Sequence, residues 1–426
     1  MMFNRHTTTL VALVSLTLPF TATAEDAPPA SAPAPTAEEK VAALEKKTGE
    51  LEKDVKKLKT LKFSGYVQAR YTQDQSSTPG IKNDGKTPGN KDGFALRRSR
   101  MRVTNKTDQT EATLQFELTP AGVLMKDASV TFLEPWTPLK GGLIAGQYSV
   151  PFGYEVPRSP AKNEFMERSQ MWSRLFPNEV DRGLGIVGSY KSLNFNLGFV
   201  NGNGAVDTAT KVFVPSDVDG DGTIAEGEVK QLGTVDFTSR SADRDDKKDL
   251  YLRLGYGSEK DIVSGAINLY QGSWGQIPVL VDEDGDGKYD NGDQVQYIPK
   301  TRYGVDVQLH RAFVESLGLT EFRLEYVQGH GWFSADVESD TDFRGYDVAF
   351  LQGLGKFVTL GVRYDVWDPD LSKEEDELTG IEPILLFPIA SSGRITTSYR
   401  VVKDHEGTDG ADKANNVLQV QFQGQF

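Results

Sequence analysis

Arginine residues at alternate positions are the first feature of this sequence that could do chemistry. Arg98, Arg100 and Arg102 are separated by one residue each, so in a β-strand their side chains share one face. A guanidinium group stays charged and donates paired hydrogen bonds to carboxylate or phosphate oxygens. A row of such groups offers a small anion successive weak binding sites. The polar positions of other alternating segments hold further arginines: Arg70, Arg253, Arg302, Arg323, Arg363, Arg394 and Arg400.

Acidic residues occupy the same polar positions and leave a second interpretation open. They are Glu117, Asp306, Glu321, Glu325 and Asp347. Pairing with these carboxylates would give the arginines a structural role. The number of aligned arginines nevertheless favours an anion-attracting surface, because rings of arginine are typical of anion pores.

Two acidic segments have the spacing of calcium-binding loops, which supply ligands from positions 1, 3, 5, 7 and 12 and need glycine at position 6. No helix pattern flanks either segment, so the expected role of a bound Ca²⁺ is structural. An acidic turn without metal is the alternative, more so for the second segment, which ends in aspartate. The ligand positions are Asp217, Asp219, Asp221, Thr223 and Glu228 in the first segment, and Asp282, Asp284, Asp286, Lys288 and Asp293 in the second.

Composition and charge disfavour several classes of function. The formal net charge is −14, whereas nucleic-acid binding needs a basic surface. The chain has no cysteine, so neither disulfides nor thiol chemistry is expected. No nucleophile motif or zinc-ligand spacing accompanies the histidines, and we expect no enzymatic activity.

The first part of the chain divides into three segments. Residues 1–24 are predicted to be a signal peptide, with Arg5, an apolar run and the cleavage sequence Ala22-Thr23-Ala24. Residues 25–35 form an Ala/Pro-rich linker. Residues 36–62 are predicted to form a coiled-coil helix that associates subunits, and a solvated single helix is the alternative. Its heptad positions are Val41, Leu44, Thr48, Leu51, Val55 and Leu58.

From Phe63 onward, apolar and polar residues alternate, as in residues 193–199 and 303–309. This period predicts β-strands with one apolar and one polar face. We expect about sixteen strands, joined by short and long links in turn, which is the layout of a transmembrane barrel. An even number of strands places both chain ends on the short-turn side. The least regular strand is 379–388, because it contains Pro383.

Residues 93–100 (GFALRRSR) and 141–185 resemble the phosphate-selective porin O/P family. The second stretch reads GGLIAGQYSVPFGYE, followed by Glu167-Arg168-Ser169, Pro177 and Asp181-Arg182-Gly183. The order Asp-Arg is reversed relative to the family, and no lysine cluster typical of a phosphate specialist is present. The likeness covers residues 63–200. It implies a trimer of sixteen-stranded barrels with arginines around an anion-conducting pore.

The segment 150–182 is too long for a simple connection. In porins the third loop folds inward, so this segment is expected to narrow the pore. Opposite charges on facing walls would create a transverse field, and an inert surface loop is the alternative. The candidate constriction residues carry both signs: Arg158, Lys162, Glu164, Glu167, Arg168, Arg174, Asp181 and Arg182.

The sequence therefore predicts an all-β protein, a sixteen-stranded antiparallel transmembrane barrel over residues 63–426, preceded by a periplasmic coiled-coil helix. The expected location is the cell outer membrane, with membrane lipid, a homotrimer of this chain and small, phosphate-like anions as partners. Structural Ca²⁺ in extracellular loops is the expected cofactor. Two alternatives stay open: a general or dicarboxylate diffusion channel, and a structural protein that tethers the membrane to the cell wall or binds a surface partner.

Overall fold

The structure, a computed structural model, describes residues 36–75, 90–119, 122–134, 136–177, 179–202, 210–215, 229–235, 247–275, 297–334, 337–374, 376–404 and 416–426. The predicted signal peptide, the Ala/Pro-rich linker and both predicted calcium loops lie outside these residues. Within the described part of the chain, no helix is long and apolar enough to cross a membrane.

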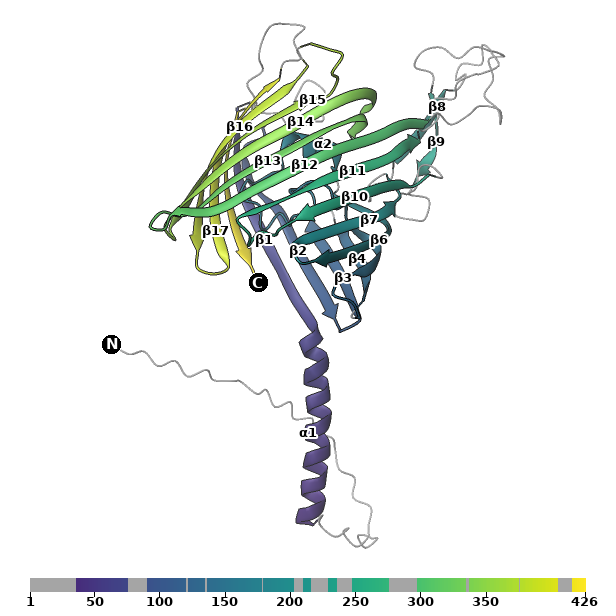
Figure 1. Ribbon diagram of the computed structural model, residues 1–426, viewed down its shortest axis with the longest axis vertical. Helices are drawn as coiled ribbons and strands as arrows, with labels where there is room; N and C mark the ends of the chain where they lie inside the picture. Colours follow the sequence, from purple (N-terminus) through teal and green to yellow (C-terminus); the bar gives the residue numbers. More distant parts are fainter. Residues whose placement is uncertain are drawn as a thin grey trace, which may run out of the picture. The chain divides into compact units, whose positions relative to one another are not determined.

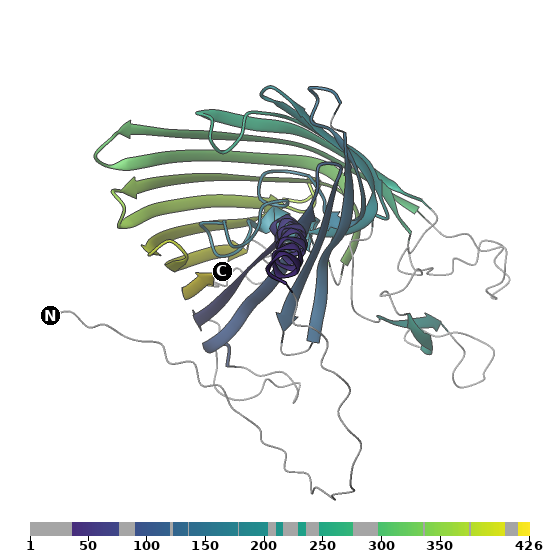
Figure 2. The ribbon, with the colours of Figure 1, turned by 90° about the horizontal axis from the view of Figure 1, so that it is seen from below.

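Sixteen strands form one closed antiparallel barrel, in which each strand pairs with its neighbours in the chain (Figure 1). Figure 2 shows the curved wall of these strands from below. The barrel strands are β1 (Leu61–Asp74), β2 (Gly93–Lys106), β3 (Thr110–Thr119), β4 (Gly122–Leu133), β5 (Gly142–Ser149), β6 (Val180–Tyr190), β7 (Leu193–Val200), β10 (Asp249–Tyr256), β11 (Val263–Gly275), β12 (Tyr297–Val314), β13 (Gly318–Ser334), β14 (Val337–Leu354), β15 (Val358–Asp368), β16 (Leu378–Ile389), β17 (Gly393–Asp404) and β18 (Val417–Gln425).

In the part of the chain that the structure describes, the remaining elements are two helices and one small sheet. Helix α1 spans Ala37–Thr60, and helix α2 spans Gln170–Leu175. Strands β8 (Thr210–Pro215) and β9 (Val229–Val235) pair only with each other. The side chains of Leu44 and Leu51 on α1 are 63% and 56% exposed. The helix thus has an uncovered apolar stripe, while its pairing with other copies stays a prediction.

The barrel closes where β1 pairs with β18. Tyr66 lies opposite Gln425, and the pairing continues to Asp74 opposite Val417. Next to the Tyr66–Gln425 pair, Gly65 and Phe426 exchange backbone hydrogen bonds of 2.9 and 3.0 Å. The ring of Phe426 occupies the space where a Cβ of residue 65 would lie, so glycine is required at this seam. Closure pairs the backbone of both edge strands, which would otherwise be left open.

Several predicted boundaries need correction. Strand β6 begins at Val180, so Asp181 and Arg182 belong to a strand and pair with Tyr148 and Gln147 of β5. The alternating pattern also predicts a long link over residues 330–341, but this link is short, because β13 and β14 continue pairing up to Ser334 and Val337. Extended pairing satisfies backbone groups that a long loop would leave to solvent. The predicted strand at 379–388 is present as β16, and its register skips Glu382 and Pro383 on the β17 side.

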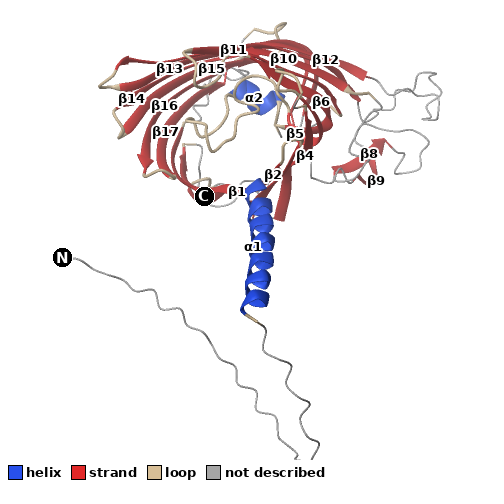
Figure 3. Cartoon of the chain, turned by 60° about the horizontal axis from the view of Figure 1, so that its bottom comes forward, coloured by secondary structure: helices blue, strands red, loops and turns tan. Residues whose placement is uncertain are grey.

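An apolar core lies inside the barrel rather than on its outside. Residues 150–179, which we call the inner loop, contribute Phe152, Met171 and Trp172 to this core, and all three are at most 1% exposed. The barrel wall contributes Tyr270 and Trp367. Helix α2 contacts β13, β14 and β15, and Figure 3 shows it within the ring of strands. The inner loop is therefore packed against the wall like the core of a small domain.

Candidate functional site

Backbone hydrogen bonds fix the inner loop where it leaves β5. The N–H of Gly153 donates to Asn268 Oδ1 at 3.2 Å, and the N–H of Tyr154 donates to Glu325 Oε2 at 2.6 Å. Gly153 has a φ of 66°, and a Cβ there would meet Trp172 and Glu325. Only glycine adopts this conformation freely and allows so close an approach. The turn directs the following residues across the lumen.

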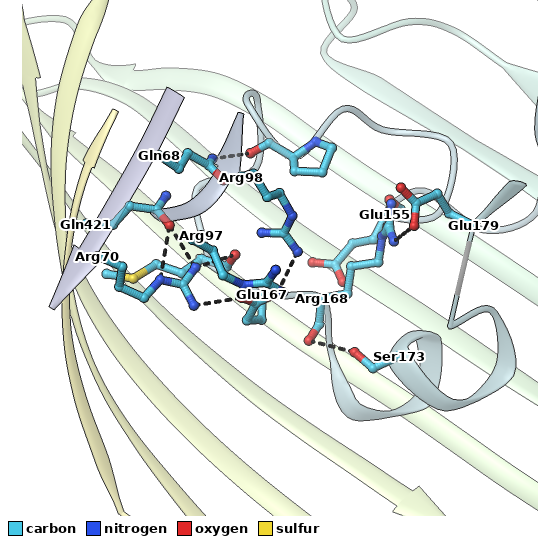
Figure 4. A network of polar contacts seen from close by, with 12 residues as sticks. Gln68, Arg70, Arg97, Arg98, Glu155, Glu167, Arg168, Ser173, Glu179 and Gln421 are labelled. Carbon is cyan, nitrogen blue, oxygen red and sulfur yellow. Dashed lines mark hydrogen bonds and ion pairs between the residues drawn. The ribbon is translucent and has the colours of Figure 1, made fainter. Parts of the chain in front are cut away.

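Glu167 is the centre of the charged network on the loop (Figure 4). Its carboxylate accepts hydrogen bonds from Arg70 at 2.7 Å, from Arg97 at 2.7 and 3.0 Å, and from Arg98 at 2.9 Å. Arg70 also donates to Gln421 of the closing strand β18. One carboxylate is thus shared by three guanidinium groups, which leaves a local excess of positive charge on the β1–β2 wall.

Arg97 was missed by the alternation rule. The register of β1 and β2 shifts between Gln68 and Ala69, so that Gln68 pairs with Arg98 and Ala69 with Leu96. Arg97 is the extra residue of a β-bulge, which re-aims its side chain. Both Arg97 and Arg98 therefore reach Glu167. Two consecutive arginines in a strand were the signal for this bulge.

Arg100 and Arg168 hold the C-terminal end of the inner loop. Arg100 lies 2.7 Å from Glu117 on the neighbouring strand and 2.9 Å from Glu179. Arg168 lies 3.2 Å from Glu179 and donates to the carbonyl oxygens of Glu155 and Val156. Arg100 is therefore a buried anchor of the loop and not an open anion site.

Arg363 and Arg323 connect the loop to the opposite wall. Arg363 lies 3.1 Å from Glu155 of the loop and 2.8 Å from Glu382 of β16. Arg323 pairs with Glu164 of the loop and with Glu321 of its own strand. These two side chains are at most 3% exposed, so each replaces lost hydration with carboxylate contacts.

The remaining predicted arginines of the wall also face the lumen. Arg302 stacks on Phe176, 4.4 Å from the ring centroid, and donates to Leu175 O. Three further arginines have polar partners. Arg253 pairs with Asp306, Arg394 donates to Asn163 O, and Arg400 lies 3.5 Å from Asp365.

A cavity of about 470 Å³ lies between the inner loop and the walls formed by β2, β10, β11 and β12. Arg102, Arg158, Lys162 and Arg253 line it, and Glu259 is the carboxylate among its lining residues. Arg102 is 42% exposed and lies 3.4 Å from Asp127. Lys162 is exposed. The cavity thus presents cationic groups to a small solute.

The other predicted loop residues take structural places. Arg174 donates to Gln170 within α2. Asp181 accepts hydrogen bonds from its neighbour Arg182 and from Gly202, and Arg182 donates to Gln147. Two further lysines enter the lumenal network without having been predicted. Lys300 is fully buried and pairs with Asp249, and Lys126 is a bulge residue of β4 close to Glu179.

The arginines set the protonation of the loop carboxylates. Burial alone would raise the pKa of Glu167, but the charges of Arg98, Arg97 and Arg70 outweigh it and hold that pKa well below its usual value. Burial likewise opposes ionisation of Glu179, whose pKa is nevertheless lowered to about 2 by Arg168, Lys126 and Arg100. Both groups are therefore carboxylates across the physiological pH range.

We predict that acid releases the inner loop only far below neutral pH. The pKa of Glu179 falls from an ordinary 4.5 to about 2 on folding, so its contribution to stability is present above 4.5 and is lost as the pH falls towards 2. Pepsin, which is active across this range, should cleave within residues 150–179 near pH 2 and leave them intact near pH 4.

The variant Glu167→Gln should be cleaved by pepsin already near pH 4, because three arginines lose their shared carboxylate. The loss of these charged hydrogen bonds is worth roughly 1–3 kcal/mol. Glu111→Gln is the matched control, since Glu111 pairs with Lys106 in an exposed position. Equal cleavage of wild type and Glu167→Gln would contradict the anchoring role of Glu167.

Comparison with known proteins supports the fold. No protein-family model and no curated protein matches this sequence. Among solved structures, OmpT of Vibrio cholerae, an outer membrane protein in its trimer form, is 11% identical with a TM-score of 0.53, over 86% of this chain and 99% of that one. The outer membrane channel DcaP of Acinetobacter baumannii is 10% identical with a TM-score of 0.53, over 86% and 97%.

An anion-selective porin from Comamonas acidovorans is 11% identical with a TM-score of 0.52, over 86% of this chain and 99% of that one. At these identities the likeness shows a shared fold alone. The sixteen-stranded barrel of this chain is thus the architecture found in bacterial outer-membrane porins.

Proposed function

We propose that this protein is an outer-membrane porin that passes small anions, such as phosphate, by diffusion through an arginine-lined lumen. The observation that carries the proposal is that two arginines of the wall stay open to water while five acids of the wall are covered. Arg97 and Arg102 are 39% and 42% exposed in the lumen. By contrast, the wall acids Asp306, Glu325, Asp347, Asp365 and Glu382 are all at most 2% exposed.

Access matters because a permeating ion interacts with the charges that water reaches. A covered carboxylate cannot be reached by a permeating ion, whereas a half-exposed guanidinium can exchange water for an anion. The cavity lined by Arg102, Arg158, Lys162 and Arg253 supports the same direction of selectivity. The likeness in fold to an anion-selective porin is consistent with it.

Association into a trimer in the outer membrane is part of this proposal. The outer face of the barrel is rich in exposed apolar side chains, among them Leu184, Ile267 and Phe350, which suit contact with lipid or with another barrel. The uncovered stripe of α1, which includes Val41, Leu44 and Leu51, suits association of periplasmic helices. The same stripe would also serve a tether to the cell wall, the alternative from another class of function.

Calcium binding by the long outer loops is also proposed, on the spacing of their acidic residues. The ends of the first loop are held together, because Pro215 of β8 lies opposite Val229 of β9. A single Ca²⁺ would neutralise the carboxylates of Asp217, Asp219, Asp221 and Glu228, which otherwise repel one another.

The selectivity proposal predicts an effect of the exposed arginines. Arg97→Gln/Arg102→Gln should shift the reversal potential in a salt gradient towards cations, while the folded barrel is retained. Arg344→Gln is the control. Arg344 is also exposed, and it pairs with Asp368. The neighbouring Gly345 faces Met171 inside the barrel, so the side chain of Arg344 is on the outer face, away from the lumen. A cation-selective wild type would refute the proposal.

Block of current by phosphate but not by a dicarboxylate would favour phosphate-like solutes over the dicarboxylate alternative.

The association proposal predicts a weaker oligomer when the stripe of α1 is made polar. Leu44→Asn/Leu51→Asn should lower the temperature at which oligomers dissociate in detergent, with the monomeric barrel still folded. Lys46→Gln/Glu50→Gln changes the same helix off the stripe and should leave that temperature unchanged. An unaltered dissociation temperature in the leucine variant would leave α1 as a spacer or tether.

The calcium proposal predicts chelator-dependent proteolysis. Removal of Ca²⁺ should expose residues 202–247 and 272–299 to trypsin without unfolding the barrel, since the carboxylates would repel one another. Asp217→Ala/Asp221→Ala should be cleaved in the first loop even when Ca²⁺ is present. If chelator changes neither loop in the wild type, the acidic segments are turns without metal.

A further inference from the structure

Three buried carboxylates meet where the inner loop touches the wall. Glu155 comes from the loop, and Glu325 and Asp347 lie directly opposite each other on β13 and β14. Their oxygen atoms lie within 4.8 Å of one another, and none of the three residues is more than 3% exposed. Like charges placed opposite each other across strands are destabilising, and burial strengthens their repulsion.

The surrounding cations do not neutralise this cluster. Arg363 pairs with Glu155, but it also pairs with Glu382. The neighbouring acids Asp306 and Asp365 are next to Glu325 and Asp347 in the sheet register and have their own arginine partners, Arg253 and Arg400. Among the described residues, Glu325 and Asp347 have no ion-pair partner. Two carboxyl groups are therefore buried without a cationic side chain beside them.

Two further polar atoms point to a ligand at this place. Asp347 Oδ2 and Ser169 Oγ are both buried and make no hydrogen bond of regular geometry among the described residues. Ser169 is fully buried, its N–H donates to Glu155 Oε2 at 2.9 Å, and its hydroxyl lies beside the Asp347 carboxylate. A buried polar atom without a partner is destabilising unless a bound group satisfies it. The hydroxyl belongs to a side chain that is not acidic and offers a fourth oxygen.

We propose that Glu155, Glu325, Asp347 and Ser169 bind a divalent cation, Ca²⁺, between the inner loop and the wall. Calcium takes six to eight oxygen ligands at about 2.3–2.6 Å, so ligands on opposite sides of the ion lie up to roughly 5 Å apart. The observed spread of the carboxylate oxygens fits this range. Mg²⁺ fits less well, because it keeps several waters and the site is buried. The ion joins two loop residues to two strands and completes the attachment of the loop.

The test separates this site from the proposed outer loops. The background protein is the full-length chain with calcium binding by both outer loops removed by Asp217→Ala/Asp221→Ala/Asp282→Ala/Asp286→Ala. It is folded in detergent and stripped of metal with EDTA. Binding of Ca²⁺ is then measured by equilibrium dialysis. About one Ca²⁺ per chain should bind to this background protein. Adding Glu325→Gln/Asp347→Asn should abolish binding, and adding Ser169→Ala should weaken it by roughly tenfold.

Glu117→Gln is the matched control, because Glu117 is also a buried lumenal carboxylate but pairs with Arg100 away from the cluster. It should leave the stoichiometry unchanged. The mobility of unheated protein on denaturing gels verifies that each barrel is folded, and Ser169→Ala remains informative if the double carboxamide does not fold. Absence of calcium binding in the background protein would overturn the proposal, as would equal binding after Glu325→Gln/Asp347→Asn. Either result would mean that protons neutralise the cluster.

Discussion

The structure depends on one constraint: each carboxylate that the inner loop buries against the wall must meet an arginine. Removing an ionised group from water costs several kcal/mol unless it is paired and hydrogen-bonded. Glu155, Glu164, Glu167 and Glu179 are all loop carboxylates, and each of them contacts arginine. The position of the loop, and with it the free cross-section of the lumen, follows from where the wall places those arginines.

Apolar packing makes this arrangement rigid. The interior of a transmembrane barrel is usually polar, but here Phe152 and Phe176 of the loop pack on Tyr270 of the wall, and Trp172 packs on Phe152. Arg302 adds its guanidinium to the same aromatic group. Apolar contacts hold the middle of the loop and ion pairs hold its borders, so neither set has to fix the loop alone.

Much of the barrel could be predicted from the sequence, because alternation has a period of exactly two residues and a one-residue error moves every side chain to the wrong face. Arg98, Arg253 and Arg363 were assigned to the lumen by this rule, and the structure places them there. The rule fails where the period breaks, as at the bulge of Arg97. It also cannot find the end of a loop whose last residues, such as Asp181, pair as a strand.

Contacts between distant segments were beyond the reach of sequence patterns. The partnership of Glu167 with Arg70, and that of Glu155 with Arg363, join residues far apart in the chain. Nothing in the local spacing indicates which arginine is open and which is an anchor. Arg100 and Arg102 stand in the same alternating row, yet Arg100 is covered by Glu117 and Glu179 while Arg102 is half open to a cavity.

The two sides of the inner loop differ in the sign of their surplus charge. On the β1–β2 side three arginines share Glu167, whereas on the β13–β14 side Glu325 and Asp347 have no cationic partner among the described residues. A surplus of buried negative charge needs a cation or protons, and a surplus of accessible positive charge attracts anions. The same folding event therefore creates both features: the loop covers the acids of one wall and leaves the arginines of the other within reach of solutes. A cation bound under the loop would balance the covered acids without reducing the positive charge that the open lumen presents.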